Sequence, residues 1–521
     1  MAPRGRDRGP VRSDPMALDP RTPVLVGVGQ VTGRPVEGQP VTDRAEPVDL
    51  MAGALREAAA DCAGAGAGDR LLARAESMRI MVPLSWGYIN PGLLVSERLG
   101  LKPKEQALTA IGGNNPQTVV SATALAIAAG DLDVALLAGA DCIFTRLAAR
   151  RDPDRPILPW TVQPPGTPEP LRLGVDRAPT TEVEAAAGLD RPVRVYPLFE
   201  NALRAAAGET IDEHQEKVSR MWARFSDVAA TNPYAWSPRA RSALEIRSVG
   251  PDNRMVSFPY AKLMNANDRV DQGAALILCS VEAARSAGVP EDRWVFPLSG
   301  ADASDHWFLS HRQDLHSSPA IKLAGQRALR LAGRGIDDIA HIDLYSCFPC
   351  AVQIAANELG LPVDDPGRAL TVTGGLGFAG GPGNNYVSHS IATMAGRLRA
   401  DPGSVGLVTG LGWYVTKHAV GLWSTTPPAH GFVHESPQDE VDGLPQRPPA
   451  SGFEGDATVE TYTVIHERHG EPESAILSLL TDDGARAWGT LTDADTLRSL
   501  EVDEGCGRRA RLGALGRTDL R

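Results

Sequence analysis

TVTGGLGFAGGPGNNYVSH, residues 371–389, is the stretch that decides the fold. It holds five glycines in the eight positions from 374 to 381 and then runs into an amphipathic helical pattern. Glycine has no side chain and permits positive φ, so the backbone can approach another group closely. Free N–H groups at a helix start can then cradle an anion or an oxyanion. The residues expected at such a ligand are Gly380, Gly381, Asn384 and Asn385, with His389 one turn into the helix.

IGGNNPQ, residues 111–117, is a glycine turn of the same kind and also opens a helix. We call each such turn an elbow; in chain order, residues 111–117 hold the first elbow and residues 371–389 the second. Because both elbows join a glycine turn to a helix start, they are interpreted as two copies of one ligand-binding motif. The residues expected to line the ligand from this side are Gly112, Gly113, Asn114 and Asn115. The alternative is that the asparagines are plain helix caps, since asparagine is favoured at that position.

An internal repeat surrounds the two elbows. GGNNPQ is followed by a helical stretch and AAGDLDVALLAGA (128–140), whereas GGPGNN is followed by a helical stretch and LRADPGSVGLVTGLG (398–412). Each unit is a glycine turn, a helix, an acidic turn and a buried strand, and shorter strands and helices alternate around both. Alternation of this kind predicts an α/β fold of two similar βαβαβ halves, with ligand chemistry between them.

Composition narrows the class of protein. The 521 residues carry a net charge of −12, which argues against a general nucleic-acid surface. No apolar run approaches the ~18 residues of a membrane span, and the basic first twenty residues lack the apolar core of a secretion signal. The six cysteines form no spaced framework, so reduced thiols in the cytoplasm are expected.

The order of patterns along the chain predicts its domains. Residues 1–20 read as a disordered tail, 21–290 as the first half and 291–425 as the second half. The rhythm breaks at about 141–259, where an insertion with its own helices is expected to form a lid or specificity subdomain. A linker at 426–456 precedes residues 457–521, whose strands and Asp483-Gly484 hairpin turn predict a small β-barrel.

Several stretches together resemble the thiolase superfamily over residues 22–425. They are VVSATALAIAAGDLDVALLAGAD (119–141), VDQGAALIL (270–278), SSPAIKLAGQRALRLAGRGIDDIAHIDLY (317–345) and GGLGFAGGPGNNYVSHSIATM (374–394). With its appended C-terminal piece the chain is most similar to actinobacterial thiolase-like proteins of type 1, which are acetyl-CoA acetyltransferase-like and carry an additional domain. The resemblance implies the thiolase-type fold and an acyl-CoA ligand.

The resemblance also implies a changed catalytic set. The position of the nucleophilic cysteine of thiolases falls on Gly113, and that of the second cysteine falls on Val408 or Thr409. The histidine of the glycine-histidine-proline motif becomes Gly381, and the residue of the Asn-Glu-Ala-Phe loop becomes Tyr345. All four standard positions therefore differ, which puts ordinary thiolysis or Claisen condensation by the usual route in doubt.

Cys347 is one candidate replacement, because it lies on the loop that lines the pocket in thiolases. As a thiolate it could accept an acyl group if His389 or His418, each beside a glycine turn of the second half, lowered its pKa. The alternative is a small buried thiol. The Cys347-Phe-Pro-Cys350 spacing also allows a redox pair or half of a zinc site, although no second pair supports a metal.

Tyr345 is the other candidate, as an oxyanion donor or an acid-base group. Thiolase-like aldolases that cleave steroid side-chain CoA esters are similar in lacking the cysteines, and they pair with a separate β-barrel protein. The alternative is a packing tyrosine with a tethered hydroxyl. Lys417 could meet a CoA phosphate or a carboxylate, although a lysine is usually exposed.

Three functions follow as hypotheses. The first is an acyl-CoA acyltransferase with a non-standard catalytic set, drawn from His389, His418, Tyr345 and Cys347. The second is an aldol or retro-aldol lyase on β-hydroxyacyl-CoA that uses Tyr345 and His389. The third is a CoA-binding protein without turnover. Under each of them the ligand is an acyl-CoA or another pantetheine thioester, no separate cofactor or metal is expected, and a monomer or a homodimer is possible.

Overall fold

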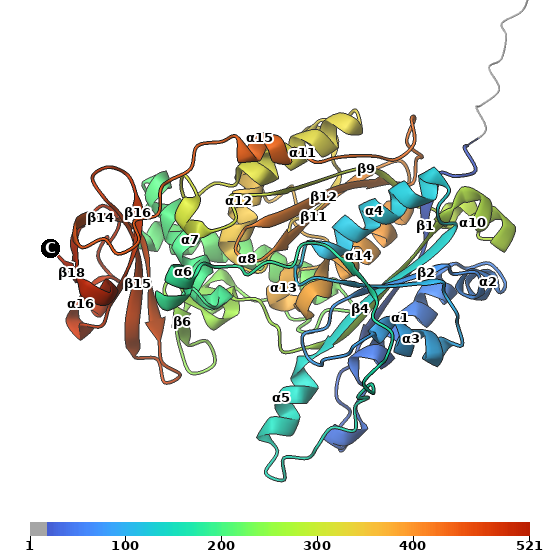
Figure 1. The fold of residues 1–521 in the computed structure, drawn as a ribbon, viewed down its shortest axis with the longest axis horizontal. Helices are drawn as coiled ribbons and strands as arrows, with labels where there is room; N and C mark the ends of the chain where they lie inside the picture. The colour runs from blue at the N-terminus through green and yellow to red at the C-terminus, as the bar shows by residue number, and fades with distance from the viewer. Residues whose placement is uncertain (1–17) are drawn as a thin grey trace, which may run out of the picture.

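The computed structural model describes residues 18–521, so most of the predicted tail lies outside the described residues. The first half of the chain builds a six-stranded mixed sheet (Figure 1). In spatial order its strands are β1 (Pro23–Thr32), β8 (Asp271–Ser280), β4 (Val134–Cys142), β2 (Ser77–Met81), β3 (Glu105–Thr109) and β5 (Leu171–Leu173). β8 runs antiparallel to both of its neighbours, and the pairings from β4 to β5 are parallel.

The second half repeats this pattern in a five-stranded sheet. Its strands, in order, are β10 (His341–Asp343), β11 (Val405–Gly412), β12 (Lys417–Ser424), β9 (Phe296–Ser304) and β13 (Val433–Glu435). β12 is antiparallel to both neighbours, as β8 is in the first sheet, and β10 pairs with β11 in parallel. The predicted duplication is therefore confirmed in the direction of the strands as well as in their order.

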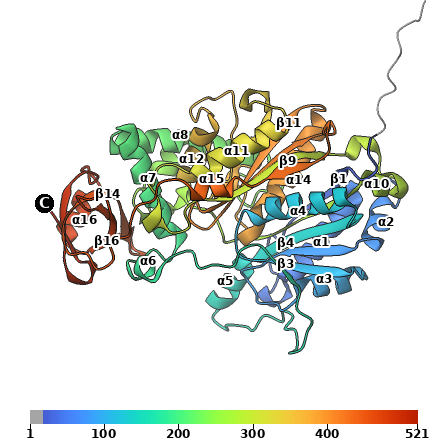
Figure 2. The same cartoon turned by 45° about the horizontal axis from the view of Figure 1, so that its top comes forward.

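Two helices lie between the sheets, α4 (Asn115–Ala129) and α14 (Tyr386–Ala400) (Figure 2). α4 contacts strands of both sheets because NPQTVVSATALAIAA is apolar or small on nearly all sides, which suits a helix enclosed by other elements. The sheets also join at their margins, where the backbone groups of Leu25 and Val295 exchange two hydrogen bonds. The two elbows thus begin the two central helices.

Most of the remaining helices cover the sheets or belong to the insertion. The remaining helices are α1 (Pro47–Asp61), α2 (Ala67–Ala73), α3 (Pro91–Leu99), α5 (Ile143–Arg151), α6 (Glu182–Ala186), α7 (Pro192–Ala207), α8 (Ile211–Thr231), α9 (Ala243–Arg247), α10 (Val281–Ala287), α11 (Pro319–Leu331), α12 (Pro349–Leu359), α13 (Gly375–Phe378), α15 (Gln438–Asp442) and α16 (Ala494–Ser499). Of these, α16 packs on β15 (Pro472–Leu480) of the C-terminal barrel and α13 packs on α8. Among residues 18–521, no helix combines the length and apolar character that crossing a bilayer requires.

The C-terminal strands form a separate sheet with its own core at one end of the molecule (Figure 1). The order is β16 (Arg486–Leu491), β15 (Pro472–Leu480), β14 (Gly455–His466), β17 (Arg509–Leu512) and β18 (Thr518–Leu520), with β6 (Met255–Ser257) and β7 (Tyr260–Ala261) attached through β14. A bridge between Thr490 and Arg517 connects the two ends of the sheet, as a barrel requires. Of the expected turn pair, only Gly484 has a positive φ.

The insertion mounts this barrel on the rest of the protein. α7 packs along β14, where Asn201 donates to the carbonyl of Tyr462 at 2.8 Å and Thr461 donates to the carbonyl of Leu198 at 2.6 Å. β6 and β7 belong to the same insertion and extend the barrel sheet. These contacts show that the insertion connects the barrel to the two-sheet part of the protein. A role of the insertion as a lid stays a prediction.

Candidate active site

The two elbows meet in the middle of the molecule. The backbone N–H of Gly112 donates to Oδ1 of Asn384 at 2.8 Å, and Nδ2 of Asn384 donates to the carbonyl of Val82 at 2.9 Å. Asn385 donates in the same way to the carbonyl of Gly139 at 2.6 Å. The second elbow is therefore fastened to the first half of the protein by its asparagine side chains.

The asparagines are not the helix caps of the alternative interpretation. α4 and α14 have Asn114 and Asn385 at their N-cap positions, yet neither side chain accepts a capping hydrogen bond. Asn115 instead donates to the carbonyl of Ala110 within its own turn. Direct binding of a ligand by the two asparagines of the second elbow stays a prediction, and their amide groups are already engaged with the protein.

The glycines that open the 371–389 stretch make room for the insertion. A Cβ on Gly374 would overlap Ala229 of α8, and one on Gly375 would lie 2.7 Å from the ring of Phe225. Both glycines also have positive φ. Close approach of α8 is therefore the physical reason for this part of the motif, and no local pattern indicates which helix fills the space.

Tyr345 fills the space in front of Gly113. A Cβ on Gly113 would overlap the Tyr345 hydroxyl and would lie 2.6 Å from the carbonyl oxygen of Leu411. The ring of Tyr345 is buried and packs edge-on against Tyr386 at 5.5 Å. Its hydroxyl makes no hydrogen bond to any residue from 18 to 521, so it lacks the tether expected of a packing tyrosine.

Two backbone donors stand beside this hydroxyl. Within the described chain, the N–H groups of Gly113 and Asn114 donate no hydrogen bond, and they precede the first turn of α4. Oδ1 of Asn114 is also buried without a partner. A helix N-terminus with unused N–H groups favours negative charge. Binding of an oxyanion at this elbow stays a prediction.

Cys347 is two residues from Tyr345 but has the properties of a buried thiol. Burial raises its pKa to about 12, and a contact with the hydroxyl of Tyr196 only partly opposes this effect. Neither His389 nor His418 hydrogen-bonds to it among the described residues. Cys347 and Cys350 are both free, and residues 18–521 contain no group of three or more His, Cys, Asp or Glu arranged for a metal ion.

Lys417 is buried at the first elbow, so the usual exposed position of a lysine does not apply. Its Nζ donates to the carbonyl of Ile111 at 2.5 Å and would lie 2.6 Å from a Cβ on Gly112. Trp307 and Trp413 present their faces to it at 5.9 and 5.8 Å. Burial lowers the pKa of Lys417 to about 8, with a small opposing effect from Asp176.

The turn between β11 and β12 places Lys417 and is strained. Trp413 and Val415 have φ values of 58° and 51°. Residues other than glycine are uncommon in this left-handed region, and a β-branched residue such as Val415 is rare there. The carbonyl of Trp413 accepts a 2.6 Å hydrogen bond from the Tyr196 hydroxyl, and Thr416 accepts one from Arg312 at 2.9 Å. The surrounding residues therefore hold the turn in its strained conformation next to the site.

His418 points away from the elbows, because consecutive residues of a strand face opposite sides of the sheet. Its Nε2 lies 3.1 Å from Asp305 and 3.3 Å from Ser318, which caps α11. His418 and Arg312 hold the pKa of Asp305 below its ordinary value although burial acts to raise it. The structure therefore joins His418 to the base of α11 and does not bring it together with His389 or Cys347.

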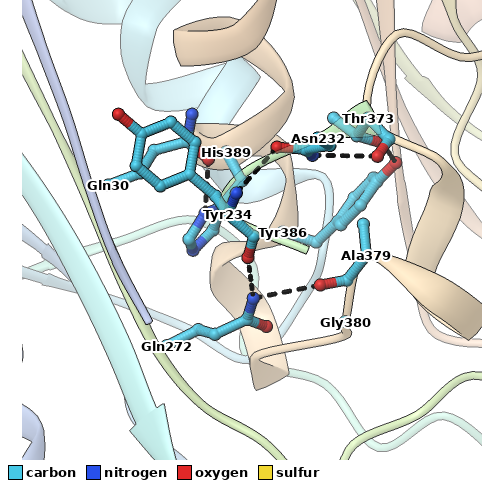
Figure 3. Close-up of a pocket in the computed structure, with 9 residues that line it drawn as sticks. All are labelled: Gln30, Asn232, Tyr234, Gln272, Thr373, Ala379, Gly380, Tyr386 and His389. Carbon is cyan, nitrogen blue, oxygen red and sulfur yellow. Dashed lines mark hydrogen bonds between the residues drawn. The ribbon is translucent and has the colours of Figure 1, made fainter. Parts of the chain in front are cut away.

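His389 and Tyr386 line a small cavity with room for about one water molecule (Figure 3). Its Nδ1 contacts Gln30 at 2.8 Å, and its Nε2 is buried without a partner. Burial lowers its pKa to about 3, so the ring is neutral at ordinary pH. The other residues that line the cavity are Asn232, Tyr234, Gln272, Thr373, Ala379 and Gly380.

Gly380 lines this cavity, whereas Gly381 lies next to Leu376 and Asn267. A Cβ on Gly380 would overlap the amide of Gln272, and the N–H of Gly381 donates to the carbonyl of Asn267 at 2.9 Å. Sequence reasoning missed Gln272 and Tyr196, and neither carries a local signal. The structure therefore gathers Gly112, Gly113, Asn114, Tyr345 and Lys417 at one place, with His389 separated from them.

Known proteins resemble the chain along its whole length. A family model described as the thiolase-like protein type 1 additional C-terminal domain matches residues 437–516. The crystal structure of a monomeric SCP2-thiolase-like protein type 1 from Mycobacterium smegmatis superposes with a TM-score of 0.81 at 33% identity. This match covers 97% of the present chain and 100% of the other.

More distant similarities concern parts of the protein. The Ltp2-ChsH2(DUF35) aldolase matches with a TM-score of 0.55 at 20% identity over 78% of this chain and 98% of that one, which shows the fold alone. An acetyl-CoA acetyltransferase from Methanocaldococcus jannaschii is 26% identical over 187 residues, or 36% of this chain. The matched region spans less than half, 45%, of that curated relative. On the evidence of the full-length match, the chain belongs to the SCP2-thiolase-like proteins of type 1.

Proposed function

We propose that this protein binds an acyl-CoA or another pantetheine thioester at the Gly112–Asn114 elbow and catalyses an aldol or retro-aldol reaction on it. The single observation that carries the proposal is the Tyr345 hydroxyl in the space of a Gly113 side chain. A protonated phenol there supports proton transfer and does not support covalent attack, because burial raises the pKa of Tyr345 above its ordinary value.

The reaction is written for a β-hydroxyacyl thioester in the cleavage direction. The bond between the α and β carbons breaks, the β carbon becomes a carbonyl, and its hydroxyl proton passes to the oxygen of Tyr345. In the same step the proton that Tyr345 carried passes to the α carbon, so the phenol is neutral before and after and never holds two protons. Charge that develops on the thioester oxygen meets the free N–H groups of Gly113 and Asn114.

The acyltransferase hypothesis has support from the acetyl-CoA acetyltransferase similarity, which favours a CoA thioester as the ligand. The proposed nucleophile of this hypothesis, the Cys347 thiol, argues against it. A thiol with a pKa of about 12 and no imidazole bound to it is almost entirely protonated at neutral pH. Of the two oligomeric states left open by the sequence, we propose the monomer, because the similar protein from Mycobacterium smegmatis is monomeric.

The test is product analysis with two classes of thioester. The purified protein is incubated with a panel of β-hydroxyacyl-CoA esters, and separately with acetoacetyl-CoA plus free CoA. We expect a shortened acyl-CoA and a free aldehyde or ketone from the first set and no thiolysis of the second. Tight CoA binding without cleavage of any ester would indicate a binding protein. An acyl group found on Cys347 by mass spectrometry would support the acyltransferase.

A further inference from the structure

Lys417 is a buried amine that the proposed reaction does not use. It is 4% exposed, and no carboxylate lies within salt-bridge distance of its Nζ in the described part of the chain. The other five lysines of the sequence are exposed or partly exposed, for example Lys104, whose side chain is 83% exposed. A buried lysine without a counter-ion is costly in its charged form, so its presence at the elbow calls for a chemical reason.

The amine and the phenol face neighbouring residues of one elbow. Lys417 Nζ stands in front of Gly112, and the Tyr345 hydroxyl stands in front of Gly113. A thioester carbonyl bound at the N–H groups of Gly113 and Asn114 would therefore meet both side chains. The carbonyl of Ile111 takes one N–H of Lys417 and fixes the direction of the amine. When Lys417 is unprotonated, the lone pair of its Nζ is available to attack a bound carbonyl.

We propose that Lys417 is an acylation site that accepts the acyl group of a thioester bound at the elbow. This inference rests on the proposed thioester site. The neutral amine attacks the thioester carbonyl, a nitrogen–carbon bond forms and the carbon–sulfur bond breaks. The proton lost by the nitrogen goes to the departing CoA thiolate. The products are an amide on Lys417 and free CoA, and no further reactant is needed.

The surroundings of Lys417 favour this chemistry over that of an ordinary lysine. With a pKa of about 8, Lys417 is unprotonated in roughly a quarter of the protein molecules at pH 7.5. An exposed lysine is unprotonated in about 0.1% of them. The faces of Trp307 and Trp413 shield the amine from water and give an acyl chain apolar surface. A bound thioester adds proximity, which raises the effective concentration of the acyl group.

Acylation at this place has a consequence for the site. The amide carries no charge and is bulkier than the ammonium, and it lies against Gly112, where the backbone leaves no spare room. We therefore expect acylated protein to bind a second thioester more weakly. Acylation of Lys417 would then inhibit thioester binding when the acyl-CoA concentration is high.

The experiment is a time course of lysine acetylation by acetyl-CoA at pH 7.5, with all six lysines followed by peptide mass spectrometry. We expect Lys417 to react at least about tenfold faster than Lys104, and an excess of desulfo-CoA to slow Lys417 but not Lys104. The Lys417→Arg variant should lose the fast, desulfo-CoA-sensitive acetylation, and the other five lysines should react as in the wild type. Equal rates at the two lysines, or a Lys417 rate unaffected by desulfo-CoA, would overturn the inference.

The same samples separate this inference from the proposed function. Cleavage of a β-hydroxyacyl-CoA by protein whose Lys417 is never acylated would overturn the inference alone. Selective, desulfo-CoA-sensitive acylation of Lys417 without any cleavage would overturn the lyase proposal and leave both the thioester site and the inference standing. Denatured protein provides the baseline, because its Lys417 should react at the rate of Lys104.

Discussion

A Cβ atom on Gly113 would overlap the hydroxyl of Tyr345, and this relationship explains why a residue without a side chain stands at position 113 of the first elbow. The phenol takes the volume of a side chain at that position, and Tyr345 follows the end of β10 in the other half of the protein. Chemistry at this elbow therefore depends on a side chain supplied across the junction between the two halves.

Gly113→Ala tests the close approach directly. The methyl group would clash with Tyr345 and would lie 2.6 Å from the carbonyl of Leu411, so Tyr345 must move. We expect a loss of about 1–3 kcal/mol in the free energy of unfolding, the usual result of overpacking, together with loss of cleavage activity. Gly87→Ala is the matched control, because a Cβ there meets no atom within 4 Å. Equal effects of the two substitutions would refute this packing.

His418→Asn tests whether His418 supports structure or catalysis. The substitution leaves the buried carboxylate of Asp305 with Arg312 but without its imidazole, and we expect a loss of roughly 3 kcal/mol in stability. The turnover number of the folded fraction should stay close to that of the wild type. His316→Asn is the control, since His316 lies 3.6 Å from Asp314 at an exposed site. A large fall in turnover with unchanged stability would restore the catalytic role predicted from the sequence.

Acid should destabilise the protein through His389. Burial lowers the pKa of His389 to about 3, and its ordinary value is 6.5. Between these values the unfolded chain binds one proton more than the folded protein, so stability decreases as the pH falls below 6.5. The expected contribution at pH 5 is about 2 kcal/mol. Denaturant unfolding at pH 7 and pH 5 should show a smaller drop for His389→Gln, and parallel drops would contradict the prediction.

Arg486 should be essential for attachment of the barrel. It is 1% exposed, pairs with Glu460 and donates to the carbonyls of Leu309 and Arg312 in the second half. Arg486→Met leaves a mostly buried carboxylate and two unpaired carbonyls, so we expect a loss of about 3–5 kcal/mol and early proteolysis near residue 450. Arg498→Met, at an exposed pair with Asp495, should change stability by less than about 1 kcal/mol. Similar behaviour of both variants would rule out this role.

The fold was predictable because its signals are local and repeated. Glycine turns, helix starts and buried strands recur in both halves, and each pattern fixes an element without knowledge of its neighbours. β4 and β11 are buried as completely as β12 and were predicted from their apolar runs. β12 escaped prediction because its sequence, KHAVGLWS, begins with two ionisable residues and is interrupted by Gly421, so no continuous apolar run marks it. Without that strand, nothing in the sequence shows that Lys417 faces the elbow and His418 faces α11.

The site was predictable only in part, for a related reason. The elbow at Gly112 and Gly113 and the replacement by Tyr345 follow from motifs within single segments. The use of Gly374 and Gly375 depends on α8, which lies about 150 residues earlier in the chain. Burial of Lys417 likewise depends on Trp307 and on the strained turn at Trp413. Contacts between distant segments decide these features, and one sequence does not specify them.

The turnover number of Tyr345→Phe on a β-hydroxyacyl-CoA, measured beside that of Cys347→Ala, tests the central claim most directly. Removal of one hydroxyl should lower turnover by about 10²-fold to 10⁴-fold, the usual contribution of a proton-transfer group, with little change in CoA binding. Cys347→Ala should retain activity within about threefold. If activity survives in Tyr345→Phe and disappears in Cys347→Ala, the phenol is not the reacting group and the account is wrong.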